Sequence, residues 1–467
     1  MILFNTLRKT VSNKIALTKS SSLKARCVRS SIVLGIGVVV AKGLTFCSKI
    51  VLARLLAPQE LGLMVLILSI TSLFEAITEI GIKQSVIQNR NGAQPEYLNI
   101  AWWFQSLRGV GLYVIAFFVT PLLCRFYFAN NPEVLAIHTN GELLALVRVA
   151  FLAILFWGFS SPRVYILEKE FRFGKVMILS QGSAVIGAVL TIVLAFVMQN
   201  VWALVIGFAG TGLVGCVLSY VLCPFRPGLS FDRRSFQDIY GFARGMVGLP
   251  ILTYAAFNID VLVGGKLVNA DLLGMYGMAF SLAQIPRDLF GCIVSPTLLP
   301  AFAQKQGDKE AICRAVLKIT KYIALFGIPL LVIAVFYSKT ILSVVYRPEY
   351  SVVAIPFCLL CIYILFLTQA TTLGSVFLGI GQPSKHRIFV VLRVSILVVL
   401  IYPAVRLFGL TGAAATLFLA SFISLCAQVF VMHRVIGLRI LDYIMSWAPG
   451  VTLAAPVLAV VWLLNRV

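Results

Sequence analysis

Apolar stretches of about 20 residues recur along nearly the whole chain, and short charged segments separate them. A helix needs about 20 apolar residues to cross the ~30 Å hydrocarbon core of a bilayer. Lipid offers the backbone no hydrogen-bond partner, so only helices or a closed barrel can span it, and continuous apolar runs disfavour a barrel. Hydrophobic residues make up 60% of the chain and charged residues 12%, about half the charged content of a soluble domain. The sequence therefore predicts an all-α polytopic membrane protein.

The apolar pattern divides into about 13 predicted helices. Their approximate ranges are 31–54, 61–82, 99–121, 143–162, 176–198, 201–222, 244–265, 273–300, 317–338, 352–372, 388–408, 411–432 and 445–464.

Positive charge dominates the loops. The chain has 39 Lys and Arg against 17 Asp and Glu, a formal net charge of +22. Most basic residues lie between apolar spans, on the side that the positive-inside rule assigns to the cytoplasm, so a nucleic-acid partner is not expected. The first thirty residues carry seven basic residues and no acid. This predicts a cytoplasmic N-terminus, with an organellar transit peptide as the less favoured alternative.

An internal repeat relates the first helical hairpin to the seventh and eighth helices with a shift of 212 residues. Residues 51–56 (VLARLL) lie over 263–268 (VGGKLV), and Gly62 lies over Gly274. Six helices separate the copies, and an even number keeps both in the same orientation, as in transporters with two parallel lobes and a site between them. We expect a basic cytoplasmic segment (1–30), an N-lobe of helices 1–6 (31–222), a cytoplasmic linker (223–243), a C-lobe of helices 7–12 (244–432) and an extra C-terminal helix (433–467).

Several strings resemble a known family. Residues 53–63 (ARLLAPQELGL) resemble the "ARLLGPEEFG" hairpin of bacterial polysaccharide exporters, the Wzx-type flippases of lipid-linked oligosaccharides. Further similar strings are 79–82 (EIGI) with 84–88 (QSVIQ), 202–205 (WALV), 258–260 (NID) with Gly264 and Gly265, and 300–302 (PAF). The chain departs from the family at Glu79, where Asp is usual, and at Val261, where a basic residue is common. It also has one helix after the twelfth where relatives often have two.

The resemblance implies membership of the superfamily of multidrug extruders, lipid II flippases and polysaccharide exporters. It implies two six-helix lobes related by a pseudo-two-fold axis, a central cavity and transport by alternating access. We therefore expect a transporter and not an enzyme, with no cofactor.

Charged residues within the spans form the predicted site. A charge at the bilayer centre costs roughly 2.5–3.5 kcal/mol, so these groups should face protein or water. Arg54 lies at the outer end of its helix and is expected to reach the interface. The other cations are expected to line a substrate-binding cavity: Lys42, Lys49, Arg108, Arg148, Arg287 and Arg393. The acids are expected to serve in ion coupling or structural pairing: Glu75, Glu79, Asp260 and Asp288.

Spacing suggests how these charges pair. Lys42 and Lys49 share one helix face, as do Glu75 and Glu79, so the two faces could hold the first two helices together. Arg287 is expected to pair with Asp260 across helices. The ten cysteines and three histidines show no zinc-ligand spacing, so neither a metal site nor a disulfide is expected.

These observations predict a flippase that moves a polyprenyl-pyrophosphate-linked oligosaccharide from the inner to the outer leaflet for cell-surface polysaccharide synthesis. Arg and Lys would hold the pyrophosphate by charge-assisted hydrogen bonds. The expected partners are membrane lipids, a polysaccharide polymerase and a chain-length regulator. One alternative is a multidrug/cation antiporter, which needs an acid-dominated cavity. Another is a membrane-embedded polymerase or glycosyltransferase, which needs carboxylates that usually lie in a large loop.

Overall fold

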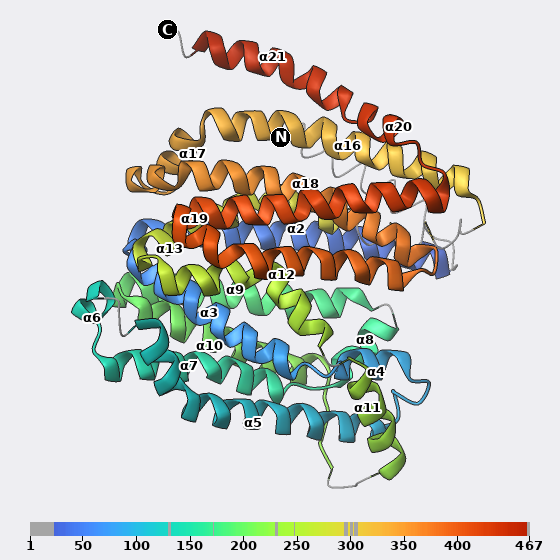
Figure 1. Ribbon diagram of the computed structural model, residues 1–467. Coiled ribbons are helices and arrows are strands. Elements are labelled where there is room, and N and C mark those ends of the chain that lie inside the picture. Colours follow the sequence, from blue (N-terminus) through green and yellow to red (C-terminus); the bar gives the residue numbers. More distant parts are fainter. Residues whose placement is uncertain are drawn as a thin grey trace, which may run out of the picture.

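The computed structural model describes residues 23–128, 132–170, 172–228, 232–246, 248–293, 298, 302 and 307–464. Helices carry all of the regular structure in these ranges (Figure 1). Eight helices of the described part are long and apolar enough to cross a membrane. The predicted all-α polytopic fold is thus confirmed. Residues 1–22 of the predicted basic segment lie outside the described residues, and the first described helix begins at Leu23.

The first half of the chain contains six long helices, at the positions where six spans are predicted. They are α2 (Leu23–Leu55), α3 (Pro58–Thr78), α5 (Pro95–Phe128), α7 (Asn140–Gly158), α9 (Phe173–Met198) and α10 (Val201–Leu222). Short helices connect them: α4 (Ile82–Gln88), α6 (Pro132–Ile137) and α8 (Arg163–Lys169).

The second half follows the predicted linker, which contains the amphipathic helix α11 (Arg233–Met246). Its longer helices are α12 (Leu249–Leu267), α13 (Ala270–Ala283), α16 (Lys309–Phe336), α18 (Ala354–Gly379), α19 (Pro383–Ile436) and α21 (Ala448–Leu464). The shorter helices are α14 (Ile285–Ile293), α17 (Ser338–Val345), the 3-10 helix η1 (Pro348–Val353) and α20 (Ile440–Met445).

Two local sequence features divide helices in this half. Gly409 lies inside α19 with φ 57° and ψ −142°, a left-handed conformation that glycine adopts readily. It separates the segments predicted as spans 388–408 and 411–432. The prediction of one continuous helix over 273–300 is wrong, because α13 ends before Gln284 and α14 follows. Pro286 explains the break, since it has no backbone N–H to donate to the preceding turn.

Helix packing forms two groups. In the first half, α7 packs on α5 and α10, and α9 packs on α10 and α2. In the second half, α18 packs on α19 and α16, α19 packs on α12, and α21 covers α16. The lobe boundaries drawn from the repeat remain a prediction, and this grouping supports them.

The crossing of α3 and α13 joins the two halves. Gly62 and Gly274 meet there, and a Cβ on Gly62 would overlap the Ala270 carbonyl, while a Cβ on Gly274 would overlap the Pro58 carbonyl. These contacts are reciprocal under the 212-residue repeat, as residues beside a two-fold axis must be. The Gln59 amide also donates a 3.0 Å hydrogen bond to Asp271, 212 residues away. The two repeats therefore pack directly on each other at this crossing.

The short helices mark the two ends of the bundle. Helices α4, α8 and α11 gather at one end, while α6, α17 and the start of α13 lie at the other (Figure 1). The first end carries many basic residues, among them Lys83, Arg163, Lys169, Arg233 and Arg234. The α3–α13 crossing lies toward the opposite end, because the first turns of both helices form it.

Candidate substrate-binding cavity

A group of cations lies where α2 passes α14. The Lys42 ammonium forms a 2.9 Å ion pair with Asp288, and the Lys49 ammonium donates a 2.9 Å hydrogen bond to the Ser281 hydroxyl. Lys49 also interacts electrostatically with Lys42 and Asp288. The predicted pairing of Lys42 and Lys49 with the acids of α3 is thus wrong, because this face of α2 meets α14 and α13.

Lys42 and Asp288 border a cavity of about 310 Å³. Its lining comes from α2, α14 and α18: Lys42, Arg287, Asp288, Phe290, Gly291, Thr368 and Thr371. Arg287 is half-buried and forms no ion pair with any acid in the described ranges. Its guanidinium lies 5.3 Å from the centre of the Phe257 ring. The cavity therefore holds more positive charge than the carboxylate of Asp288 can neutralise.

The predicted pair between Arg287 and Asp260 does not form. Asp260 is fully buried in α12 and accepts a 2.7 Å hydrogen bond from the Tyr276 hydroxyl. Tyr276 belongs to a stack of rings with Phe280 and Tyr363 that fills the core. Asp260 is thus hydrogen-bonded to a neutral tyrosine of α13 and does not meet Arg287.

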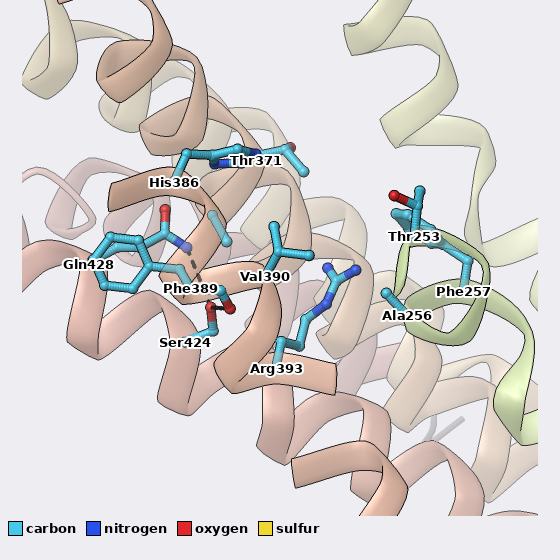
Figure 2. Close-up of a pocket in the computed structure, with 11 residues that line it drawn as sticks. Thr253, Ala256, Phe257, Thr371, His386, Phe389, Val390, Arg393, Ser424 and Gln428 are labelled. Atoms are coloured by element: carbon cyan, nitrogen blue, oxygen red, sulfur yellow. Dashed lines mark hydrogen bonds between the residues drawn. The ribbon is translucent and has the colours of Figure 1, made fainter. Parts of the chain in front are cut away.

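A second cavity, of about 180 Å³, lies deeper in the C-terminal half between α12, α18 and α19. Figure 2 shows Arg393 extending from α19 toward Ala256 and Phe257 of α12. The Arg393 side chain is buried, and its guanidinium lies 4.9 Å from the centre of the Phe257 ring. Other lining residues are Thr253, Thr371, His386, Phe389, Ser424 and Gln428. Thr371 lines both cavities, so they are neighbours.

Arg108, Glu75 and Glu79 form a separate group in the N-terminal half. The Arg108 guanidinium makes a 2.9 Å ion pair with Glu79, whose other carboxylate oxygen accepts a hydrogen bond from the Gly81 amide. Glu75 is exposed and interacts electrostatically with Arg108. Arg108 is thus neutralised locally, and none of the ion pairs in the described residues links it to α2 or α14.

Tyr165 of α8 supports the same region from outside the spans. Its hydroxyl donates a 2.8 Å hydrogen bond to Gln105, and the Gln105 amide donates to Trp157 and Ser160. Burial raises the pKa of Tyr165 to about 12, so the hydroxyl keeps its proton at neutral pH.

Arg148 and Arg54 lie away from both cavities. The Arg148 guanidinium covers the Phe117 ring of α5 at 3.8 Å from the ring centre, and it donates to the Phe117 carbonyl. Arg54 donates to the Val344 and Val345 carbonyls of α17. Of the six cations predicted to line one cavity, Lys42 and Arg287 line the cavity beside α2, and Lys49 interacts with Lys42 and Asp288 next to it. Arg393 lines the adjacent cavity, and Arg108 and Arg148 lie elsewhere.

Neutral groups complete both cavities, and the search for charge did not find them. They include Phe257, Thr368, Thr371, His386 and Gln428. Phe257 directly precedes the N-x-D string at residues 258–260. This position beside a family motif was the sequence feature that could have indicated its role. The others lie in apolar helices, where Ser, Thr and Gln also satisfy backbone or neighbouring groups and so give no specific signal.

Comparison with known proteins agrees with this architecture. The chain is 24% identical over 450 residues to the lipopolysaccharide biosynthesis protein WzxC of Escherichia coli (strain K12), covering 96% of this chain and 89% of that protein. It is 24% identical over 278 residues to the teichuronic acid biosynthesis protein TuaB of Bacillus subtilis (strain 168), covering 59% of this chain and 55% of TuaB.

Among solved structures, the fold is similar to that of the lipid II flippase MurJ in an inward closed conformation, with a TM-score of 0.75 at 14% sequence identity. The match covers 92% of this chain and 93% of MurJ. Residues 51–355 match the family described as polysaccharide biosynthesis protein, which confirms the resemblance to the polysaccharide exporters. The chain is therefore a multi-pass helical membrane protein that belongs to the polysaccharide biosynthesis protein family.

Proposed function

We propose that the protein is a flippase that carries a polyprenyl-pyrophosphate-linked oligosaccharide from the inner to the outer leaflet. The observation that carries this proposal is the cavity beside α2, which Lys42, Arg287 and Asp288 line and beside which Lys49 interacts with Lys42 and Asp288. Several cations around one acid leave positive charge that a pyrophosphate would balance. Charge-assisted hydrogen bonds to phosphate oxygens are short and strong, and a guanidinium can bind two oxygens at once.

The remaining parts of the substrate have matching surroundings. Sugars need water and hydrogen-bonding groups, which the Thr368 and Thr371 side of the cavity offers. The polyprenyl chain needs lipid, because each CH₂ group buried there stabilises membrane binding by about 0.8 kcal/mol. With the cytoplasm negative, outward movement of one negative charge is favoured by about 2.3 kcal/mol per 100 mV. The membrane potential could thus assist export without any covalent step.

Alternating access is the second part of the proposal. The Gly62–Gly274 contact and the Gln59–Asp271 hydrogen bond close the bundle at one end between the two halves. Separating α3 from α13 would open that end, while the basic end closes. The α3–α13 contact combines the close approach of Gly62 and Gly274 with apolar packing. Opening would also release the hydrogen bonds from Arg54 to the Val344 and Val345 carbonyls of α17.

Orientation and partners follow from the same scheme. The basic end of the bundle, with α4, α8 and α11, would face the cytoplasm of a bacterial inner membrane. The α3–α13 crossing would then form the outer closure. A polysaccharide polymerase and a chain-length regulator would receive the delivered repeat units at the outer face. The surplus of positive charge gives no support to the alternative of a cation antiporter.

The test uses purified full-length protein in liposomes that contain a fluorescent polyprenyl-diphosphate oligosaccharide. A membrane-impermeant glycosidase added outside measures how much substrate has reached the outer leaflet. We expect wild-type protein to accelerate this delivery and the double variant Lys42→Gln/Arg287→Gln to slow it at least tenfold. Lys175→Gln, which removes an exposed lysine of α9 outside the cavity, is the matched control. Delivery by the double variant at the wild-type rate would overturn the proposal.

A further inference from the structure

Arg393 is a buried cation whose charge nothing nearby neutralises. Its side chain is 8% exposed, and it forms no ion pair with any acid in the described ranges. The Nε group has no hydrogen-bond partner among the described residues. The guanidinium lies over the Phe257 ring, and the Arg287 guanidinium lies 5.3 Å from the centre of the same ring. A buried cation is costly unless an anion and hydrogen bonds satisfy it, so this site is built for a partner that the chain itself does not supply.

The surroundings of Arg393 add polar groups of both kinds. The Gln428 amide donates to the Ser424 hydroxyl at 3.3 Å, while the carbonyl oxygen of Gln428 and the Nδ1 atom of His386 are buried without partners. Figure 2 shows these side chains around the same cavity as Arg393, with Thr371 beside His386. Free donors and acceptors beside a cation suit a ligand that carries hydroxyl groups as well as negative charge.

Size and charge limit the ligand further. The cavity of about 180 Å³ is many times larger than the 10–15 Å³ that one water needs, yet it is smaller than the neighbouring cavity of about 310 Å³. It has room for one sugar residue and not for a chain of them. The Arg393 guanidinium offers a planar pair of donors that matches one carboxylate. Arg287, which lies over the same Phe257 ring, also lines the larger cavity, where Arg287 and Lys42 together match the more highly charged pyrophosphate.

We infer that the Arg393 cavity is a subsite for an acidic sugar of the transported oligosaccharide, with the guanidinium of Arg393 binding the sugar carboxylate. This inference rests on the proposed function and adds the substrate class: a repeat unit that contains a uronic acid or another carboxylated sugar. Thr371 borders both cavities, so a sugar near the pyrophosphate can enter the subsite while the pyrophosphate stays beside Lys42 and Arg287.

The test compares two synthetic substrates in the same liposome assay. Both are polyprenyl-diphosphate trisaccharides, and they differ only in one residue, glucuronic acid or glucose. Measurements are made without a membrane potential, so that the extra charge does not change the driving force. We expect wild-type protein to deliver the glucuronic acid substrate about 10- to 100-fold more efficiently at limiting concentration, the range typical of a hydrogen-bonded charge pair.

Variants separate the subsite from general damage. Arg393→Gln is expected to lower delivery of the glucuronic acid substrate to the level of the glucose substrate, whose delivery changes less than about twofold. Arg287→Gln is expected to slow both substrates alike. If Arg393→Gln does not fold, Arg393→Lys serves instead and is expected to slow only the acidic substrate, by about 3- to 10-fold.

Three results would overturn the inference. In the first, wild-type protein delivers both substrates equally. In the second, the Arg393 variant slows both substrates by the same factor. In the third, wild-type protein delivers neither substrate, a result that refutes the proposed function as well and is thereby distinguishable from failure of the subsite alone.

Discussion

The glycine contact between α3 and α13 leads to a sharp prediction for Gly62→Ala. In the structure, an added Cβ at Gly62 would overlap the Ala270 carbonyl and approach the backbone nitrogen of Gly274 to 2.9 Å. Backbone atoms cannot move aside as a flexible side chain can. The two helices must therefore separate to accommodate the methyl group. If the contact exists only while this end of the bundle is closed, the substitution raises the free energy of the closed state and leaves the open state unchanged.

The magnitude follows from known costs of overpacking. Extra carbon atoms in a well-packed interior cost about 1–3 kcal/mol. A coupling free energy of this size changes the ratio of closed to open molecules by about 5- to 150-fold. Gly274→Ala meets the Pro58 carbonyl and the backbone nitrogen of Gly62 in the reciprocal way, so it should act with similar strength. The free-energy change in the double variant should be smaller than the sum of the two single changes, because both substitutions separate the same pair of helices.

Distance measurements between spin labels can read this change. Labels at Ile137 of α6 and Val344 of α17 suit the purpose, because both side chains are exposed and lie at the same end of the bundle. In a background without native cysteines, we expect Gly62→Ala to increase the population with a longer separation. Gly111→Ala is the matched control, since its Cβ would meet nothing within 4 Å. An unchanged distance distribution together with a lowered melting temperature would refute the reasoning and reduce the contact to ordinary packing.

Three further predictions concern stability. Arg108→Gln and Glu79→Gln should each destabilise the folded protein by about 1–3 kcal/mol, between the values for exposed and buried ion pairs. In thermal unfolding, the double variant should lose much less stability than the sum of the two single losses, and additive losses would exclude a coupled pair. Gly409→Ala should cost about 1–3 kcal/mol, because essentially only glycine adopts a φ of 57° with a ψ of −142°, while an added Cβ would meet nothing within 4 Å. Gly409→Asn should cost about as much, and an unchanged melting temperature of either variant would contradict the backbone explanation. The Tyr165 contribution to stability should persist up to pH ~10, its unfolded pKa, and be lost as the pH rises through about 12, its folded value; Tyr165→Phe should remove that part of the alkaline decline, and an identical decline in both proteins would contradict the assignment.

The long helices were predictable because they depend on one strong physical requirement. Any segment that crosses lipid must be apolar and helical, and the ranges of α9 and α10 follow closely from that rule. The repeat was also informative, although its sequence match is weak. It aligns Gly62 with Gly274, and these two glycines are in contact in the structure. The break at Pro286 was missed because the apolar pattern continues across it, while the missing backbone donor acts only locally.

The sequence predicted several of the charged residues that form the candidate site, but it did not predict the partners that they contact. Charges within apolar spans identified Lys42, Lys49 and Arg287, because lipid penalises such groups wherever they lie. Which acid each cation meets depends on how the helices are rotated and which neighbour comes first. Asp260 meets Tyr276, a neutral residue that no charge pattern can reveal. Arg148 lies over Phe117 for the same reason, since an aromatic ring is a partner that spacing alone does not predict.

Direct observation of the bound headgroup is the measurement that tests the central claim most closely. A structure of the protein with a polyprenyl-diphosphate oligosaccharide would locate the two phosphorus atoms. We predict that phosphate oxygens lie within hydrogen-bond distance of the Lys42 and Lys49 ammonium groups and the Arg287 guanidinium, with Asp288 displaced from Lys42. A diphosphate bound beside Arg108 and Glu79, or on the outer surface of α16 and α21, would contradict the account.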